Sequence, residues 1–109
     1  METTRAVGAL SALAQASRLQ VYRLLVQAGP EGMAAGDLAD RLDIPANTLS
    51  FHLKALNQAG LVQTRPEGRF IFYSANYEQM NALLGFLTEN CCGGKSCRPP
   101  IAPRKRRVS

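Results

Sequence analysis

The chain has 109 residues, 46% of them hydrophobic, which fits one small globular domain rather than a disordered chain. Its formal net charge of +5 comes from the last twelve residues, because residues 1–97 carry eight cations and eight acids. Bulk charge is therefore no evidence that the folded body binds nucleic acid. No apolar run approaches the ~18 residues of a membrane span and no signal peptide follows the first residues, so we expect a cytoplasmic protein without a membrane partner.

Two helices are expected at the start of the chain. A first helix over about residues 4–15 is predicted by apolar residues at helical spacing, namely Val7, Leu10, Leu13 and Ala14. The run Ser17–Gln20 has the pattern of a capping box, with serine at the N-cap and glutamine three residues later. It predicts a second, more apolar helix that ends at Gly29 and Pro30.

A short helix, a turn and a longer helix follow, which is the order of a helix-turn-helix motif. Residues 33–42 predict the short helix, and residues 43–46 predict the turn, where Pro45 suits the first turn of the next helix. That next helix begins near Asn47 and carries one apolar seam at i, i+4 and i+7, formed by Leu49, Leu53 and Leu56.

The other face of this helix carries small polar groups, one aromatic ring and one cation, which suits a DNA major groove. The candidate DNA contacts are Asn47, Thr48, Ser50, Phe51 and Lys54. Asn47 and Ser50 can bond base edges, Phe51 can meet a thymine methyl group, and Lys54 can bind guanine or phosphate. A solvated helix face is the alternative. His52, at the border of the seam, is expected to be packed or hydrogen-bonded rather than to contact DNA.

A two-stranded hairpin is predicted after Gly60, from strand-forming residues 61–65 and 69–73 with a turn at residues 66–68. It would be the wing of a winged helix, with Arg65 and Arg69 at its tip. Arginines on a wing hold phosphates and set the register on DNA. Arginines retained for solubility are the alternative.

The last helix is expected to run from a capping box at Asn76 and Gln79 to about Asn90. Its apolar stripe is formed by Met80, Leu83, Leu84 and Leu87. A chain this short offers few places to bury both this stripe and that of the first helix. We therefore expect a homodimer that pairs the N- and C-terminal helices across a two-fold axis, with burial inside one chain as the alternative.

Three cysteines within seven residues form the second candidate site, namely Cys91, Cys92 and Cys97. Zinc prefers four ligands and no fourth is local, whereas trivalent arsenic or antimony suits three soft thiolates. The alternatives are a redox sensor, in which Cys97 oxidises with either neighbour, and a cadmium, zinc or lead site that adds Glu89. Residues 98–109 are basic and proline-rich and are expected to be disordered, which leaves one domain over residues 1–97.

The chain resembles the ArsR (ArsR/SmtB) family of metalloregulatory repressors over about residues 5–90. The matching segments are Ser17-Arg18-Leu19, residues 49–56, residues 59–62, and Arg65 with residues 67–69. The resemblance implies a mainly α, dimeric winged helix-turn-helix repressor that leaves operator DNA when a toxic metal or metalloid binds. We expect no enzyme activity, because the single histidine leaves no constellation of base, nucleophile and orienting group, and we expect no organic cofactor.

This sequence departs from the family pattern at two places. Family arsenic sensors often carry a Cys-x-Cys pair on the short helix before the reading helix, and residues 33–42 contain no cysteine. The sensor is therefore expected at Cys91, Cys92 and Cys97, as in the branch of arsenic-responsive repressors with a site at the end of the last helix. Phe51 stands where many relatives have a polar residue, so the operator sequence cannot be inherited from them.

Overall fold

The computed structural model describes residues 1–94, so Cys97 and the predicted disordered tail lie outside the described residues. Elements follow in the order α1 (Thr3–Leu13), α2 (Ala16–Ala28), β1 (Met33–Ala34), α3 (Ala35–Leu42), α4 (Ala46–Gln58), β2 (Val62–Glu67), β3 (Phe70–Ala75), α5 (Tyr77–Leu87) and the 3-10 turn η1 (Cys91–Gly94). The mainly helical fold with a small antiparallel sheet confirms the predicted winged helix-turn-helix. None of the helices within residues 1–94 has the length and hydropathy to cross a membrane.

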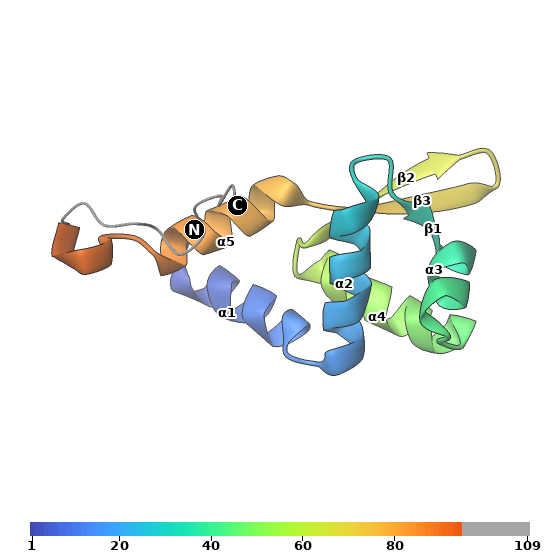
Figure 1. Ribbon diagram of the computed structural model, residues 1–109, viewed down its shortest axis with the longest axis horizontal. Helices are drawn as coiled ribbons and strands as arrows, with labels where there is room; N and C mark the ends of the chain where they lie inside the picture. Colours follow the sequence, from blue (N-terminus) through green and yellow to red (C-terminus); the bar gives the residue numbers. More distant parts are fainter. Residues whose placement is uncertain (95–109) are drawn as a thin grey trace, which may run out of the picture.

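The elements form two groups along the long axis of the molecule. Figure 1 shows α2, α3 and α4 beside the three-stranded sheet at one end, and α1 next to α5 at the other. One core runs through both groups, and its largest fully buried side chains include Leu25, Leu38, Leu49, Leu53 and Leu83. The helix-turn-helix unit is thus held on the same core as the terminal helices.

The buried face of α1 differs from the predicted one. Ala6, Ala9 and Ala12 are buried, whereas Val7 and Leu10 are 55% and 42% exposed. Alanine has no side-chain atoms beyond Cβ, so this face allows α1 to lie close to α2, α4 and α5, which it contacts. Val7 and Leu10 are therefore left uncovered within one chain, whereas Leu13 packs against the core.

The N-cap of α2 lies two residues before the predicted one, Ser17. Gln15, with extended backbone angles, is the N-cap, and its side chain accepts a hydrogen bond from the backbone N–H of Arg18 at 2.9 Å. Ser17 lies inside the first helical turn. The predicted capping box is therefore wrong, although the helix and its end at Gly29 are confirmed.

The short helix before α4 begins at Ala35, because Met33 and Ala34 form strand β1 instead of its first turn. β1 pairs antiparallel with β3 in a sheet of order β1-β3-β2. Gly32 permits this approach: it has a φ of +76°, and a Cβ atom there would collide with the carbonyl of Tyr73. A two-residue strand carries no periodicity, so the pattern of residues 33–42 could not separate it from the helix.

The hairpin has a tighter turn than the sequence indicates. Glu67 pairs with Phe70, which leaves Gly68 and Arg69 as a two-residue turn, and Gly68 has the positive φ expected at its first position. Pro66 and Glu67 belong to β2 rather than to the turn. Arg65 pairs with Phe72, so the prediction that it lies at the tip is wrong, and only Arg69 of the two is there.

The start of α5 is capped as predicted, but only in one direction. The side chain of Asn76 accepts a hydrogen bond from the backbone N–H of Gln79 at 3.2 Å. The reciprocal bond of a capping box is absent, because the backbone N–H of Asn76 donates to the carbonyl of Leu61 at 2.8 Å. The Nε2 atom of Gln79 is buried without a hydrogen-bond partner among the described residues. The helix ends at Leu87, earlier than the predicted Asn90.

Candidate nucleic-acid interface and thiol site

The two faces of α4 differ as the leucine seam predicts. Leu49, Leu53 and Leu56 are at most 1% exposed and hold the helix against the core. The candidate DNA contacts Asn47, Thr48, Ser50, Phe51 and Lys54 are all exposed, and Phe51 reaches 65%. An aromatic side chain this open packs against little of its own chain. The structure thus places the five candidates on one free surface.

Pro45 is the N-cap of α4, one position before the predicted first helical turn, and its backbone is extended with ψ 145°. Before it, Asp43 ends α3 in the left-handed region with a φ of 54°. This residue reverses the chain between the two helices within a few positions. The turn therefore fixes the angle at which α4 presents its exposed face.

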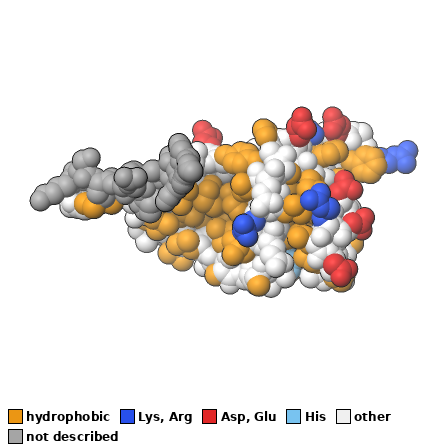
Figure 2. All heavy atoms as spheres, viewed as in Figure 1, with side chains coloured by type: hydrophobic (Ala, Val, Ile, Leu, Met, Phe, Trp, Pro, Cys, Tyr) orange, Lys and Arg blue, Asp and Glu red, His pale blue; other side chains and the backbone are white. Residues whose placement is uncertain are grey.

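The surface around α4 is not uniformly basic. Figure 2 shows acidic side chains along the end of the molecule formed by α3 and the hairpin. The exposed acids of this region are Glu31, Asp37, Asp40, Asp43 and Glu67. Phosphates would be repelled by these carboxylates, so any DNA contact must rely on a few well-placed cations rather than on a broad positive field.

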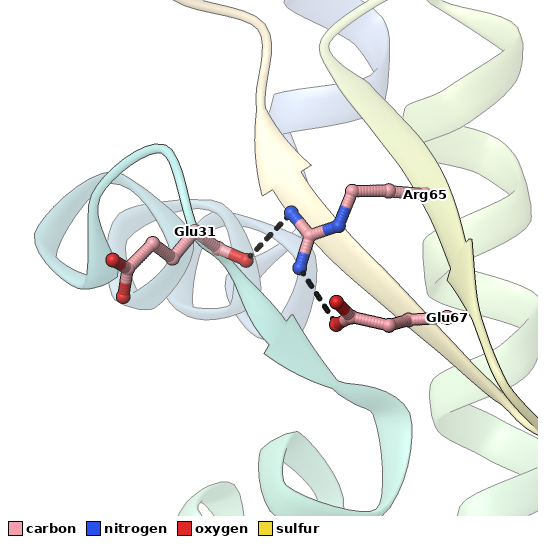
Figure 3. A network of polar contacts seen from close by, with 3 residues as sticks. All are labelled: Glu31, Arg65 and Glu67. Carbon is pink, nitrogen blue, oxygen red and sulfur yellow. Dashed lines mark hydrogen bonds and ion pairs between the residues drawn. The ribbon is translucent and has the colours of Figure 1, made fainter.

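Arg65 is tied to its own chain rather than extended toward solvent. Figure 3 shows its guanidinium between Glu67 and the loop after α2: Nη2 lies 3.3 Å from Oε1 of Glu67, and Nη1 donates to the carbonyl of Glu31 at 3.3 Å. The same guanidinium lies 5.1 Å from the ring centroid of Phe72. The bond to Glu31 joins the hairpin to the loop after α2, and the other two contacts lie within the hairpin. Of the two predicted wing arginines, Arg69 at the tip is the one exposed without such ties among the described residues.

Three side chains from two helices meet beside the exposed face of α4. The Nε of Arg18 donates to Nδ1 of His52 at 3.4 Å, and the guanidinium of Arg18 lies 5.9 Å from the ring centroid of Phe51. His52 and Phe51 make an edge-to-face contact with ring centroids 6.3 Å apart. The prediction that His52 is packed and hydrogen-bonded is confirmed, since it is 6% exposed.

The charge of His52 is set by these surroundings. Burial and the neighbouring Arg18 cation both lower the pKa of His52 from its ordinary value of 6.5, because each disfavours the imidazolium. At neutral pH the ring is therefore uncharged, and the bond from Arg18 to Nδ1 requires its proton on Nε2. Sequence reasoning missed the contact between Arg18 and His52, because Arg18 entered it only as part of a presumed capping box and of a segment that resembles the family.

Two of the three predicted cysteine ligands are described, and they lie side by side. The Sγ atoms of Cys91 and Cys92 are 3.6 Å apart in η1, which begins shortly after the end of α5. Cys92 has a φ of 59° and Gly93 a φ of 67°, so the chain turns sharply at the two cysteines. Residues 1–94 contain no group of three potential metal ligands, and the predicted third ligand, Cys97, lies beyond them.

A helix-turn-helix with an exposed second helix and a two-stranded wing defines a DNA-binding protein of the winged helix class. Residues 13–65 match the family model described as "Helix-turn-helix domain". The transcriptional activator HlyU of Vibrio cholerae is 32% identical over 83% of this chain and 81% of its own length. The arsenical resistance operon repressor of Bacillus subtilis is 35% identical over 74% of this chain and 73% of its own.

Solved structures agree with these relatives. An ArsR-like transcriptional regulator from Rhodococcus has a TM-score of 0.71 at 26% identity, covering 84% of this chain and 82% of its own. Reduced HlyU from Vibrio cholerae has a TM-score of 0.65 at 32% identity, covering 83% and 92%. A homodimeric winged helix-turn-helix domain of Mycobacterium bovis, titled a possible ArsR-family regulator, has a TM-score of 0.64 at 26% identity, covering 87% and 88%.

The chain belongs to the ArsR family of transcriptional regulators. Its relatives are DNA-binding regulators, which confirms the prediction that the protein is not an enzyme.

Proposed function

We propose that the protein is a metalloid-responsive repressor, which binds operator DNA as a homodimer in the cytoplasm and leaves it when trivalent arsenic or antimony binds Cys91, Cys92 and Cys97. The observation that carries the proposal is the 3.6 Å separation of the Cys91 and Cys92 sulfurs directly after α5. In their reduced form, two cysteine sulfurs this close can bind one soft ion as thiolates, and Cys97 is near enough in sequence to complete three bonds. The relative named as an arsenical resistance operon repressor supports this choice of inducer.

Operator reading is assigned to the exposed face of α4. In each protomer, Asn47 and Ser50 bond base edges, Phe51 meets a thymine methyl group, and Lys54 binds guanine or phosphate, while Arg69 holds a phosphate from the wing. Two reading helices related by a two-fold axis enter successive major grooves, so the half-sites lie about 34 Å apart.

The dimer is assigned to α1 and α5. Val7, Leu10 and Leu87 are between 42% and 55% exposed, although they are apolar and lie on two neighbouring helices. Figure 2 shows hydrophobic side chains gathered over this end of the molecule. A second copy placed here would bury them, and the homodimeric Mycobacterium bovis relative supports that arrangement.

A hydrogen-bonded junction gives the thiols a path to the reading helix. The start of α5 is bound to the residues that follow α4: the Nδ2 of Asn76 donates to the carbonyl of Gly60 at 3.0 Å, and its backbone N–H donates to the carbonyl of Leu61. A shift of α5 caused by ligand binding at its other end would therefore displace the end of α4. A coupling of about 1–3 kcal/mol corresponds to ~5–150-fold weaker operator binding, and operator DNA weakens metalloid binding by the same factor.

The test replaces the thiols one at a time. Cys91→Ser, Cys92→Ser and Cys97→Ser are expected to keep operator affinity and to lose release by arsenite, because a hydroxyl is a poor ligand for a soft ion. Fluorescence anisotropy of a labelled operator duplex, titrated with arsenite and antimonite, measures both properties. A variant without cysteines that arsenite still releases would refute the site.

A thiol redox sensor on the same scaffold is the second candidate. It is favoured by the relative whose solved structure is titled as reduced HlyU. Two thiols and one hydrogen peroxide would give one disulfide and two waters, with Cys97 joined to Cys91 or Cys92. Release by peroxide in metal-free buffer, reversed by a dithiol, would select this candidate. Parallel titration with cadmium, zinc and lead tests the third alternative, a divalent metal site.

A further inference from the structure

We propose that Arg18 is a DNA-backbone contact and that His52 is the positioning residue that aims it at the phosphates beside the reading helix. This inference rests on the proposed DNA binding by α4 and adds a residue of α2 to it.

The first support is the unused hydrogen-bonding capacity of Arg18. Its Nε is bound to His52, but no hydrogen bond or ion pair joins its two terminal nitrogens to any of residues 1–94. The residue is half-buried, and the bond to His52 holds its Nε in place. A guanidinium fixed at Nε with two available terminal amino groups is suited to bind a phosphate with two parallel hydrogen bonds.

The second support is the distance from Arg18 to the reading face. Its guanidinium lies 5.9 Å from the ring centroid of Phe51, which is 65% exposed in the middle of α4. The major groove of B-DNA is about 12 Å wide, so a helix along its centre has a phosphate wall roughly 6 Å away on each side. With Phe51 in the groove, Arg18 lies at the position of one wall.

The third support is the scarcity of other cations. Residues 1–94 contain seven Lys and Arg against eight Asp and Glu, and Arg65 is already paired with Glu67. The exposed acids of α3, of the loop after α2 and of the hairpin oppose DNA binding at the same end of the molecule. Each unpaired cation near α4 therefore carries a large share of the phosphate contacts, and Arg18 adds to Lys54 and Arg69.

His52 decides where the guanidinium points. Its Nδ1 accepts the Nε–H of Arg18, and it can do so only while that nitrogen carries no proton. The ring itself is buried and packed, so it fixes one end of the guanidinium. Without this acceptor the long arginine side chain would regain rotameric freedom, which binding would have to remove again.

The decisive measurement is the salt dependence of operator binding. The probe is a fluorescein-labelled duplex carrying the sequence that the wild-type protein selects from a randomised pool. Arg18→Met removes one phosphate-binding cation from each protomer, so the slope of log affinity against log salt becomes shallower by about 0.9 per phosphate. Between 50 and 200 mM salt, the affinity deficit of the variant then shrinks roughly 3.5-fold for each phosphate that is no longer neutralised.

Arg23→Met is the matched control, because it removes the same charge from the same helix. Arg23 lies five positions after Arg18, which places it about 140° around α2 and away from α4. It is exposed and should leave the slope unchanged. Circular dichroism melting of both variants checks that each is folded.

Two variants of His52 test the positioning role. Asparagine places an acceptor oxygen near the position of Nδ1, so His52→Asn should retain the wild-type slope, whereas His52→Leu should approach that of Arg18→Met. An unchanged slope in Arg18→Met would overturn the backbone contact, and equal slopes in the two His52 variants would overturn the positioning role. A wild-type protein that selects no sequence and binds no duplex would refute the proposed function itself.

Discussion

His52 is the single histidine of the chain, and its surroundings in the folded protein determine whether its ring is charged. It lies between the leucine seam and the exposed face of α4, where a side chain can be buried and still touch a surface residue. The sequence alone places a histidine at that border, but the identity of its partner depends on α2, which is 34 residues earlier. No local sequence pattern predicts the contact between Arg18 and His52.

The lowered pKa of His52 predicts a loss of stability on acidification. In the unfolded chain the imidazole binds a proton near pH 6.5, whereas in the folded protein it resists protonation until lower pH. The unfolded state thus binds more protons in this window, so the free energy of unfolding falls as the pH drops through 6.5 toward the folded pKa.

The measurement is urea unfolding of wild type and His52→Asn at about pH 7.5 and about pH 5.5, on either side of the ordinary histidine pKa. The wild type should lose more unfolding free energy between these values than the variant, which lacks the titrating group. Other groups that titrate in this range cancel in the comparison. An equal loss in both proteins would show that His52 has the same pKa in the folded and unfolded states.

The buried face of a helix was predictable from sequence where that face is leucine and not where it is alanine. In α4, the spacing of Leu49, Leu53 and Leu56 separates core from surface without further information. In α1, the apolar pattern pointed to Val7 and Leu10, yet the buried residues are alanines, because close approach to three other helices favours the smallest side chain. The exposed face that is proposed to read DNA follows from the first pattern. The contact between Arg18 and His52 required the three-dimensional structure.

Gly32 allows strand β1 to pair with β3, although the two residues of β1 show no sequence periodicity. Gly32→Ala should destabilise the protein strongly, because alanine would be strained at a φ of +76° and its Cβ would collide with the Tyr73 carbonyl. Gly68→Ala is the matched control: its φ is +64°, but a Cβ there meets nothing within 4 Å.

The control should lose about 1–2 kcal/mol of unfolding free energy, the usual cost of a left-handed backbone for alanine. Gly32→Ala should lose clearly more, since β1 must also move away from β3. Chemical denaturation of both variants measures the difference. Equal losses of unfolding free energy in the two variants would mean that β1 can move away from β3 without a free-energy cost and does not stabilise the sheet.

At the scale of the whole molecule, the proposed reading and sensing sites lie on opposite groups of elements. The exposed face of α4 belongs to the group with the sheet, while η1, with Cys91 and Cys92, follows α5 at the other end (Figure 1). Within residues 1–94, two connections join the thiol end to the reading helix: the shared core and the hydrogen bonds of Asn76 to Gly60 and Leu61. A dimer through α1 and α5 would make a third, because it would set the distance between the two α4 helices.

The dimer itself is tested by placing a charge on the uncovered apolar residues. Val7→Glu and Leu87→Glu should give monomers, because each would bury a carboxylate between protomers. Both side chains are more than half exposed within one chain, so the substitutions should leave its fold intact. Leu19→Glu is the control, since Leu19 is also apolar and 43% exposed but lies on α2.

Sedimentation velocity measures the oligomeric state. Fluorescence anisotropy measures the affinity of each variant for duplexes that carry one or two half-sites. Linking two DNA-binding modules raises affinity by about 100-fold or more, so both variants should lose at least that factor on the two-half-site duplex. Their affinity for a single half-site should stay close to that of the wild type, because α4 is untouched. Dimers that persist in both variants would move the interface away from α1 and α5 and remove the proposed route from the thiols to the spacing of the reading helices.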